Sequence, residues 1–141
     1  SQRYVSRTHF LQAMQTYARA HQKDGKPYIG EYYDEITGEW LKGDNPRSRH
    51  YNHSTFCDLV IAGLAGLVPR LEPEVVVDPL VPEEAWDFFC LENLCYHGRS
   101  LTILWDRDGS HYHRGAGLQV LADGVRIAHS NCLGRITGRL P

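Results

Sequence analysis

The residue types best suited to catalysis are concentrated in one polar stretch, from Tyr28 to Ser54. Aromatic and basic side chains alternate there with five carboxylates, which are Glu31, Asp34, Glu35, Glu39 and Asp44. Glycoside hydrolysis needs a carboxylic acid that protonates the leaving oxygen, a second group that activates water, and rings that stack on sugar faces. The stretch therefore favours carbohydrate chemistry, and an ordinary charged surface loop is the alternative.

Two predicted helices must position this stretch. Before it, Phe10, Met14 and Tyr17 recur at helical spacing, and Asp24-Gly25 supplies a turn where that helix ends. A loop of this length is either functional or disordered, and its many aromatic rings argue against disorder.

A second helix is expected to begin at Ser54 as its N-cap and to end before Pro69. Its apolar face runs from Phe56 to Leu67. Gly63 and Gly66 lower the helix propensity, so they predict a close approach of neighbouring chain. Two helices cannot close a core alone, and residues 1–70 are therefore predicted to be one hairpin of a larger helical assembly.

Residues 71–141 carry a β pattern and are predicted to form a second, antiparallel domain. Short strands are expected at 75–77, 86–96, 100–105, 118–121 and 125–128. Turn sequences separate them at His97-Gly98, Asp108-Gly109 and Asp123-Gly124. Regular spacing of this kind is typical of a sandwich, so the predicted fold class is α+β.

Composition excludes several function classes. The chain has 141 residues, 42% of them hydrophobic, which is enough for a packed core. The chain has 15 Lys and Arg and 17 Asp and Glu, so no basic surface for nucleic acid is expected. The apolar runs are too short to span a bilayer, so no membrane partner is expected either.

The other constellations of reactive residues are weaker. The four cysteines, expected as buried free thiols, are Cys57, Cys90, Cys95 and Cys132. His111 and His113 would share one face of a strand, and Asp106 to Ser110 resembles the start of a calcium loop, but neither set is completed by further ligands. A nucleophilic Cys57 beside His53 lies at the apolar start of a helix. No metal and no cofactor is therefore predicted.

Two segments of the loop and the start of the second helix resemble a known group of enzymes. Glu31-Tyr32-Tyr33-Asp34 with Thr37-Gly38, followed by Tyr51-Asn52-His53-Ser54, is similar to the late helical hairpin of (α/α)6-barrel glycosidases. That six-hairpin group includes trehalases, processing alpha-glucosidase I and mannosylglycerate-hydrolase-like enzymes. The second half resembles the β domain that follows such barrels in many bacterial glycosidases, through residues 75–80, 96–99 and 101–106.

This resemblance implies roles for individual residues. Glu31 would be the general base that deprotonates the attacking water in an inverting reaction. Glu35 and Glu39 are the competing carboxylates. The substrate cleft would be lined by four side chains, which are Tyr33, Trp40, Tyr51 and His53. The partner would be a carbohydrate, an oligosaccharide or glycoside, whose sugar, linkage and anomer the sequence does not specify.

The resemblance also implies what is missing. The group's general acid is an Asp from an earlier part of the barrel, and no segment here supplies it. The chain is therefore expected to be a C-terminal fragment that lacks the N-terminal barrel portion, is inactive alone, and self-associates through its exposed helix faces. The compartment, bacterial cytoplasm or periplasm, is left open. The alternative is a non-catalytic carbohydrate-binding or structural accessory module, holding glycans through Trp86 or Trp105.

Overall fold

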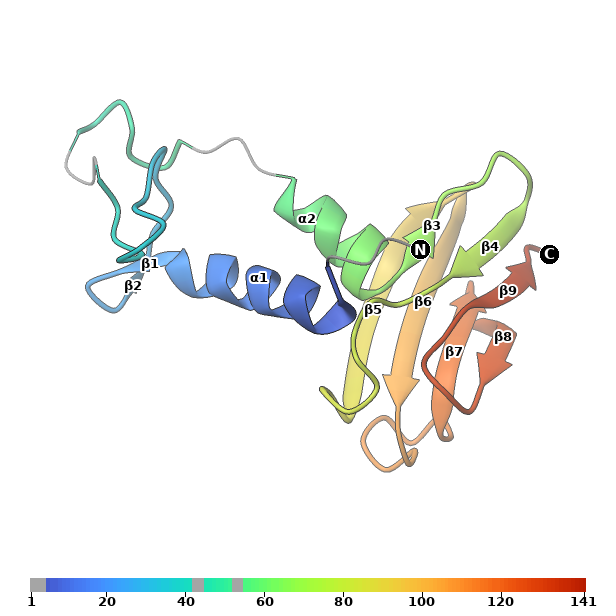
Figure 1. The fold of residues 1–141 in the computed structure, drawn as a ribbon. Helices are drawn as coiled ribbons and strands as arrows, with labels where there is room; N and C mark the ends of the chain where they lie inside the picture. Colours follow the sequence, from blue (N-terminus) through green and yellow to red (C-terminus); the bar gives the residue numbers. More distant parts are fainter. Residues whose placement is uncertain (1–4, 42–44, 52–54) are drawn as a thin grey trace.

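The fold combines a helical segment with a β-sandwich, as a computed structural model of the chain shows (Figure 1). The structure describes residues 5–41, 45–51 and 55–141. The predicted α+β class is confirmed by this arrangement. Within the described residues, no helix is both long enough and apolar enough to cross a membrane.

Helix α1 (Arg7–Ala20) begins where the sequence caps it. The Ser6 hydroxyl accepts a hydrogen bond from the His9 amide at 3.2 Å, and the His9 ring accepts one from the Ser6 amide at 3.3 Å. This reciprocal cap satisfies two amides that the first helical turn leaves without intrahelical partners. The helix is followed by a small hairpin of β1 (Gln22–Lys23) and β2 (Lys26–Pro27), which turns at Asp24-Gly25 with positive φ, as predicted.

The second helix ends earlier than predicted and is irregular, and its predicted N-cap, Ser54, lies outside the described residues. Helix α2 (Phe56–Asp58) continues directly into a π-helical segment, η1 (Leu59–Leu64), in which the Ala65 amide bonds to the Val60 carbonyl at 2.9 Å. The expectation that Pro69 ends this helix was wrong. Gly66 ends it, because its φ of +80° lies outside the helical region.

The predicted close approaches at the two glycines are confirmed. A Cβ on Gly63 would lie 2.4 Å from the Phe10 ring, so α1 packs directly on the second helix there. A Cβ on Gly66 would lie 2.3 Å from the Asp78 carbonyl carbon. The Asp78 amide also bonds to the Gly66 carbonyl at 2.8 Å, which ties the helix end to the first sheet.

Two antiparallel sheets form the sandwich. The three-stranded sheet has the order β3-β4-β9, with bounds Leu67–Val68, Glu74–Val77 and Ile136–Arg139. The four-stranded sheet has the order β5-β6-β7-β8, with bounds Phe88–Tyr96, Arg99–Asp106, Gly117–Ala122 and Val125–Ser130. The predicted hairpin turns at His97-Gly98 and Asp123-Gly124 both have positive φ, whereas β6 and β7 are joined by a longer loop than predicted, residues 107–116.

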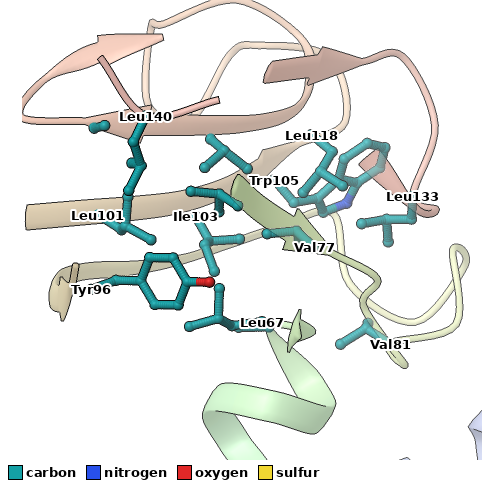
Figure 2. Close-up of a cluster of buried hydrophobic side chains, with 14 residues drawn as sticks. Leu67, Val77, Val81, Tyr96, Leu101, Ile103, Trp105, Leu118, Leu133 and Leu140 are labelled. Atoms are coloured by element: carbon teal, nitrogen blue, oxygen red, sulfur yellow. The ribbon is translucent and has the colours of Figure 1, made fainter. Parts of the chain in front are cut away.

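The core lies between the two sheets. Figure 2 shows side chains from both sheets directed toward one another, with Val77 on one side and Ile103 and Trp105 on the other. All three are at most 1% exposed. Strand β3 lies before residue 70 and pairs with β4, so the sandwich includes residues from the predicted hairpin segment. A division at residue 70 stays a prediction.

Two further sequence expectations were wrong. All four cysteines are free, as expected, but they are exposed rather than buried. For Cys90 and Cys95 the reason is that they lie on the outer side of an edge strand. Trp105 is 1% exposed and donates from its indole nitrogen to the Trp86 carbonyl at 3.1 Å, so it cannot stack on a glycan.

Candidate functional site

The candidate site is built on the loop that joins the β1–β2 hairpin to α2. Figure 1 shows this loop at the end of α1 that points away from the two sheets. Two short backbone pairings order it, Gly30 with Arg49 and Tyr33 with Trp40. The His50 amide also bonds to the Ile29 carbonyl at 2.9 Å. These pairings bring residues 28–33 and 48–50 side by side, although the sequence separates them.

Glu31 is held at this junction. The Ser48 hydroxyl donates to the Glu31 Oε2 atom at 2.7 Å. Ser48 is 3% exposed and Glu31 is half-buried, so the donor is fixed by its surroundings and orients the carboxylate. A carboxylate that accepts a charge-assisted hydrogen bond is held more firmly than a solvated one.

Tyr32 interacts with the same carboxylate. A hydrogen bond with Glu31 and the negative charge of Glu31 together raise the pKa of the Tyr32 hydroxyl above its ordinary value. Arg47 opposes this shift, and Tyr51 adds to it. Glu31, Arg47 and Tyr51 all act on Tyr32, and these four residues are referred to below as the Glu31 cluster.

The neighbouring Asp34 has a different role. Its Oδ1 atom accepts hydrogen bonds from the Ile36 amide at 2.8 Å and the Thr37 amide at 2.9 Å. These backbone bonds, Thr37 first, lower the pKa of the Asp34 carboxyl below its ordinary value. Asp34 thereby closes the turn that ends at Gly38, where φ is +74°.

Tyr33 and Trp40 pack inside the loop. The Trp40 indole nitrogen donates to the Ala20 carbonyl at 2.8 Å, which attaches the loop to the end of α1. The Trp40 ring lies 5.7 Å from the Tyr33 ring, and a Cβ on Gly30 would meet it at 2.9 Å. Tyr33 in turn lies 6.4 Å from the Tyr17 ring of α1. Both residues fix the loop, and their predicted contact with substrate stays a prediction.

The predicted site residues are thus brought together in part. Glu31 and Tyr51 both act on the pKa of Tyr32, and Tyr51 is 46% exposed. Glu35 and Glu39 are exposed and lie outside the Glu31 cluster. His53 lies outside the described residues. Ser48 and Tyr32 were missed, because only the pairing of the two loop segments brings Ser48 to Glu31.

The Asp106 carboxylate of the β half is used in its own structure. Asp106, the first residue of the calcium-like sequence, accepts hydrogen bonds from the amides of Gly109, His111 and Tyr112 at 2.8–3.1 Å. His111 and His113 lie in this loop and not on a strand, which corrects the expectation that they share a strand face. Among the described residues, no group of three or more His, Cys, Asp or Glu side chains is arranged to hold a metal ion.

Comparison with known proteins gives matches in both halves of the chain. Residues 2–54 match the mannosylglycerate hydrolase MGH1-like glycoside hydrolase domain. Residues 72–129 match the C-terminal domain of glycosyl hydrolase family 65. Glu31 and its cluster lie within the first match, and most of the sandwich lies within the second.

A solved structure of a protein named sialidase resembles the chain as a whole. The two superimpose with a TM-score of 0.93 and share 48% sequence identity. The match covers 98% of this chain and 13% of that one, so the chain spans a small part of its relative. The predicted resemblance is thereby confirmed: this chain is similar to the C-terminal part of glycoside hydrolases, with a mannosylglycerate-hydrolase-like segment followed by a sandwich of the family 65 C-terminal type.

Proposed function

We propose that this chain contributes the general base of an inverting glycoside hydrolase, and that Glu31 is that base. The substrate is an oligosaccharide or glycoside, and the general acid comes from outside residues 1–141. Residues 1–70 would complete a helical barrel, and residues 71–141 would form the β domain beside it.

The observation that carries the proposal is the anchoring of Glu31. A general base must point one oxygen at a water molecule while the other is fixed, and the Ser48 hydroxyl at 2.7 Å supplies such a fixed contact. The other loop carboxylates that the structure describes are less suited to this role. Asp34 is used in its own turn, and Glu35 and Glu39 are exposed side chains outside the cluster.

Tyr51 and Tyr33 are proposed to contact the sugar, together with Trp40 and His53. Tyr51 carries the stronger support, since it is 46% exposed and acts on Tyr32, the neighbour of Glu31. Exposed aromatic rings beside a carboxylate are suited to hold a pyranose face against the reacting water.

The test is Glu31→Gln in the complete gene product, with Glu35→Gln and Glu39→Gln as matched controls. Loss of a general base lowers kcat by roughly 10²–10⁴-fold, because the amide cannot take the proton from water. We expect that loss only for Glu31→Gln, with KM little changed. Hydrolysis at the wild-type rate by Glu31→Gln would refute the assignment and favour the accessory-module alternative.

Inversion is tested separately by product stereochemistry. Proton NMR of the first sugar released, recorded before mutarotation, identifies the anomer. An inverting reaction gives the anomer opposite to the substrate linkage, because water attacks the face opposite to the leaving group. Release of the same anomer would indicate a covalent intermediate and a nucleophilic carboxylate instead.

A further inference from the structure

A pocket lies on the outer face of the four-stranded sheet, away from Glu31. It is a partly open hollow of about 260 Å³, lined by residues of β5, β6 and the 107–116 loop. Its lining residues are Cys90, Glu92, Thr102, Leu104, Tyr112 and Arg114. Phe89 and Leu91 pack against the core, so the alternating residues Cys90 and Glu92 face outward.

The loop that forms one wall is held by two buried polar side chains. Asp106 is 1% exposed and accepts three backbone amide hydrogen bonds from the loop. Gln119 is 2% exposed and donates to the carbonyls of Arg114 at 3.1 Å and Gly115 at 2.9 Å. A wall fixed in this way does not have to be ordered when a ligand binds, which favours affinity.

The pocket places opposite charges around the Cys90 thiol. Partial burial and the charge of Glu92 raise the pKa of Cys90, and the charge of Arg114 opposes them. Within the described residues, no ion pair joins Glu92 to Arg114. The carboxylate and the guanidinium are therefore available to a ligand that offers both donors and acceptors.

One lining residue of the pocket, Tyr112, belongs to a group of neighbouring aromatic rings. Tyr112 is half-buried in its wall, and its ring lies edge-on to Phe88, with centroids 6.0 Å apart. Phe88 is 45% exposed and is stacked on the His111 ring at 3.5 Å and 6°. Rings beside a carboxylate, a guanidinium and the Thr102 hydroxyl form the combination that binds a pyranose, with apolar faces for stacking and several hydroxyls for hydrogen bonds.

We infer that this pocket binds one neutral sugar residue of a glycan, separately from the Glu31 site. The choice of a carbohydrate as the ligand rests on the proposed function. The position of the site and its polar lining rest on the pocket itself. The two opposite charges on its walls match hydroxyl groups better than an ionised group. Its volume lies just below the roughly 300–1,000 Å³ of pockets that take drug-sized ligands, so one ring fits and a longer chain must extend outside.

Alkylation of Cys90 by iodoacetamide provides the test, because this thiol lines the pocket. The complete gene product is labelled with and without glucose, mannose or galactose, and each cysteine is followed by peptide mass spectrometry. We expect at least one of the sugars to slow labelling of Cys90 and to leave Cys95, on the same strand, unchanged. Glycerol at the same hydroxyl concentration is expected to give no protection.

Two arginine variants test whether the protection of Cys90 arises from sugar bound in the pocket. Arg114→Ala removes a charged hydrogen-bond donor and should raise the sugar concentration needed for half-protection about tenfold. Arg126→Ala, an exposed arginine on β8, is the matched control and should leave it unchanged. Equal labelling of Cys90 with and without each sugar, or equal protection by glycerol, would overturn the inference. Because the assay needs no turnover, Glu31→Gln should keep the protection even where the proposed function fails.

Discussion

At the scale of single residues, the candidate site depends on one carboxylate and its neighbours. Glu31 accepts from the buried Ser48 hydroxyl and acts on Tyr32 through a hydrogen bond and its charge. The adjacent Asp34 has a short side chain and uses its carboxylate for backbone amides two and three residues later. Glu31 and Asp34 therefore differ in their hydrogen-bond partners. This difference can be examined without any substrate.

The first prediction concerns the ionisation of Tyr32. Glu31→Gln removes the negative charge that disfavours the tyrosinate, so the pKa of Tyr32 should fall toward its ordinary value of 10.0. NMR titration of ring-labelled tyrosine measures this shift. Glu35→Gln serves as the control and should leave the Tyr32 titration unchanged. An unaltered titration in Glu31→Gln would mean that the two side chains do not interact in solution.

At the scale of elements, two types of glycine determine how helices and hairpins end. Gly66 ends the second helix at a φ of +80° and lies against the Asp78–Pro79 backbone. Gly98 turns β5 into β6 at a φ of +75°, and a Cβ there would meet nothing within 4 Å. Both glycines adopt the left-handed conformation, but only Gly66 also lies where a side chain would not fit.

A pair of alanine substitutions separates these two requirements. Gly98→Ala should lower the free energy of unfolding by about 1–2 kcal/mol, the cost of an L-residue in the left-handed region. Gly66→Ala should lose about 1–3 kcal/mol more, because backbone must move to admit the new methyl group. Denaturant unfolding of both variants measures the difference. Equal losses would show that the contact with Asp78 and Pro79 is not tight.

The β7–β8 turn should respond to acid. The Ser100 amide, followed by the Arg99 guanidinium, lowers the pKa of Asp123 below 3.8, so its contribution to stability is present above pH 3.8. That contribution is lost as the pH falls through the lower, folded value, since the protonated acid loses its charged bonds.

Asp123→Asn tests this, because Asn tolerates the φ of 49° at that position. The difference in melting temperature between wild type and variant should shrink as the pH falls below 3.8. A difference that is constant across this range would contradict the assigned role of the Asp123 charge.

At the scale of the whole molecule, the helical segment leaves apolar surface uncovered. A groove of about 440 Å³ runs between α1 and α2. Its lining residues are Phe10, Ala13, Met14, Tyr17, Thr55, Phe56 and Leu59. The two helices bury part of their apolar faces against each other, as the Phe10–Gly63 contact shows, but they do not close a core as the two sheets do.

The chain of residues 1–141 by itself is therefore predicted to self-associate through this groove. Sedimentation velocity over a range of concentrations measures the association. Leu59→Glu places a charge in the groove, where Leu59 is 42% exposed, and should shift the chain toward monomer. Leu71→Glu changes a leucine that is 95% exposed outside the groove and should have no effect. A wild-type chain that stays monomeric at high concentration would contradict the prediction.

The sequence by itself determined the elements whose causes are local. The turns at Asp24-Gly25, His97-Gly98 and Asp123-Gly124 follow from residue type alone, because a turn with positive φ is a property of a short segment. Residues 31–34 likewise carried the resemblance to glycoside hydrolases.

Only the tertiary structure decided which side chains meet. Ser48 reaches Glu31 because two loop segments pair, and Trp105 is buried because two sheets face each other. Contacts of this kind depend on chain folding between distant residues, which no local pattern specifies.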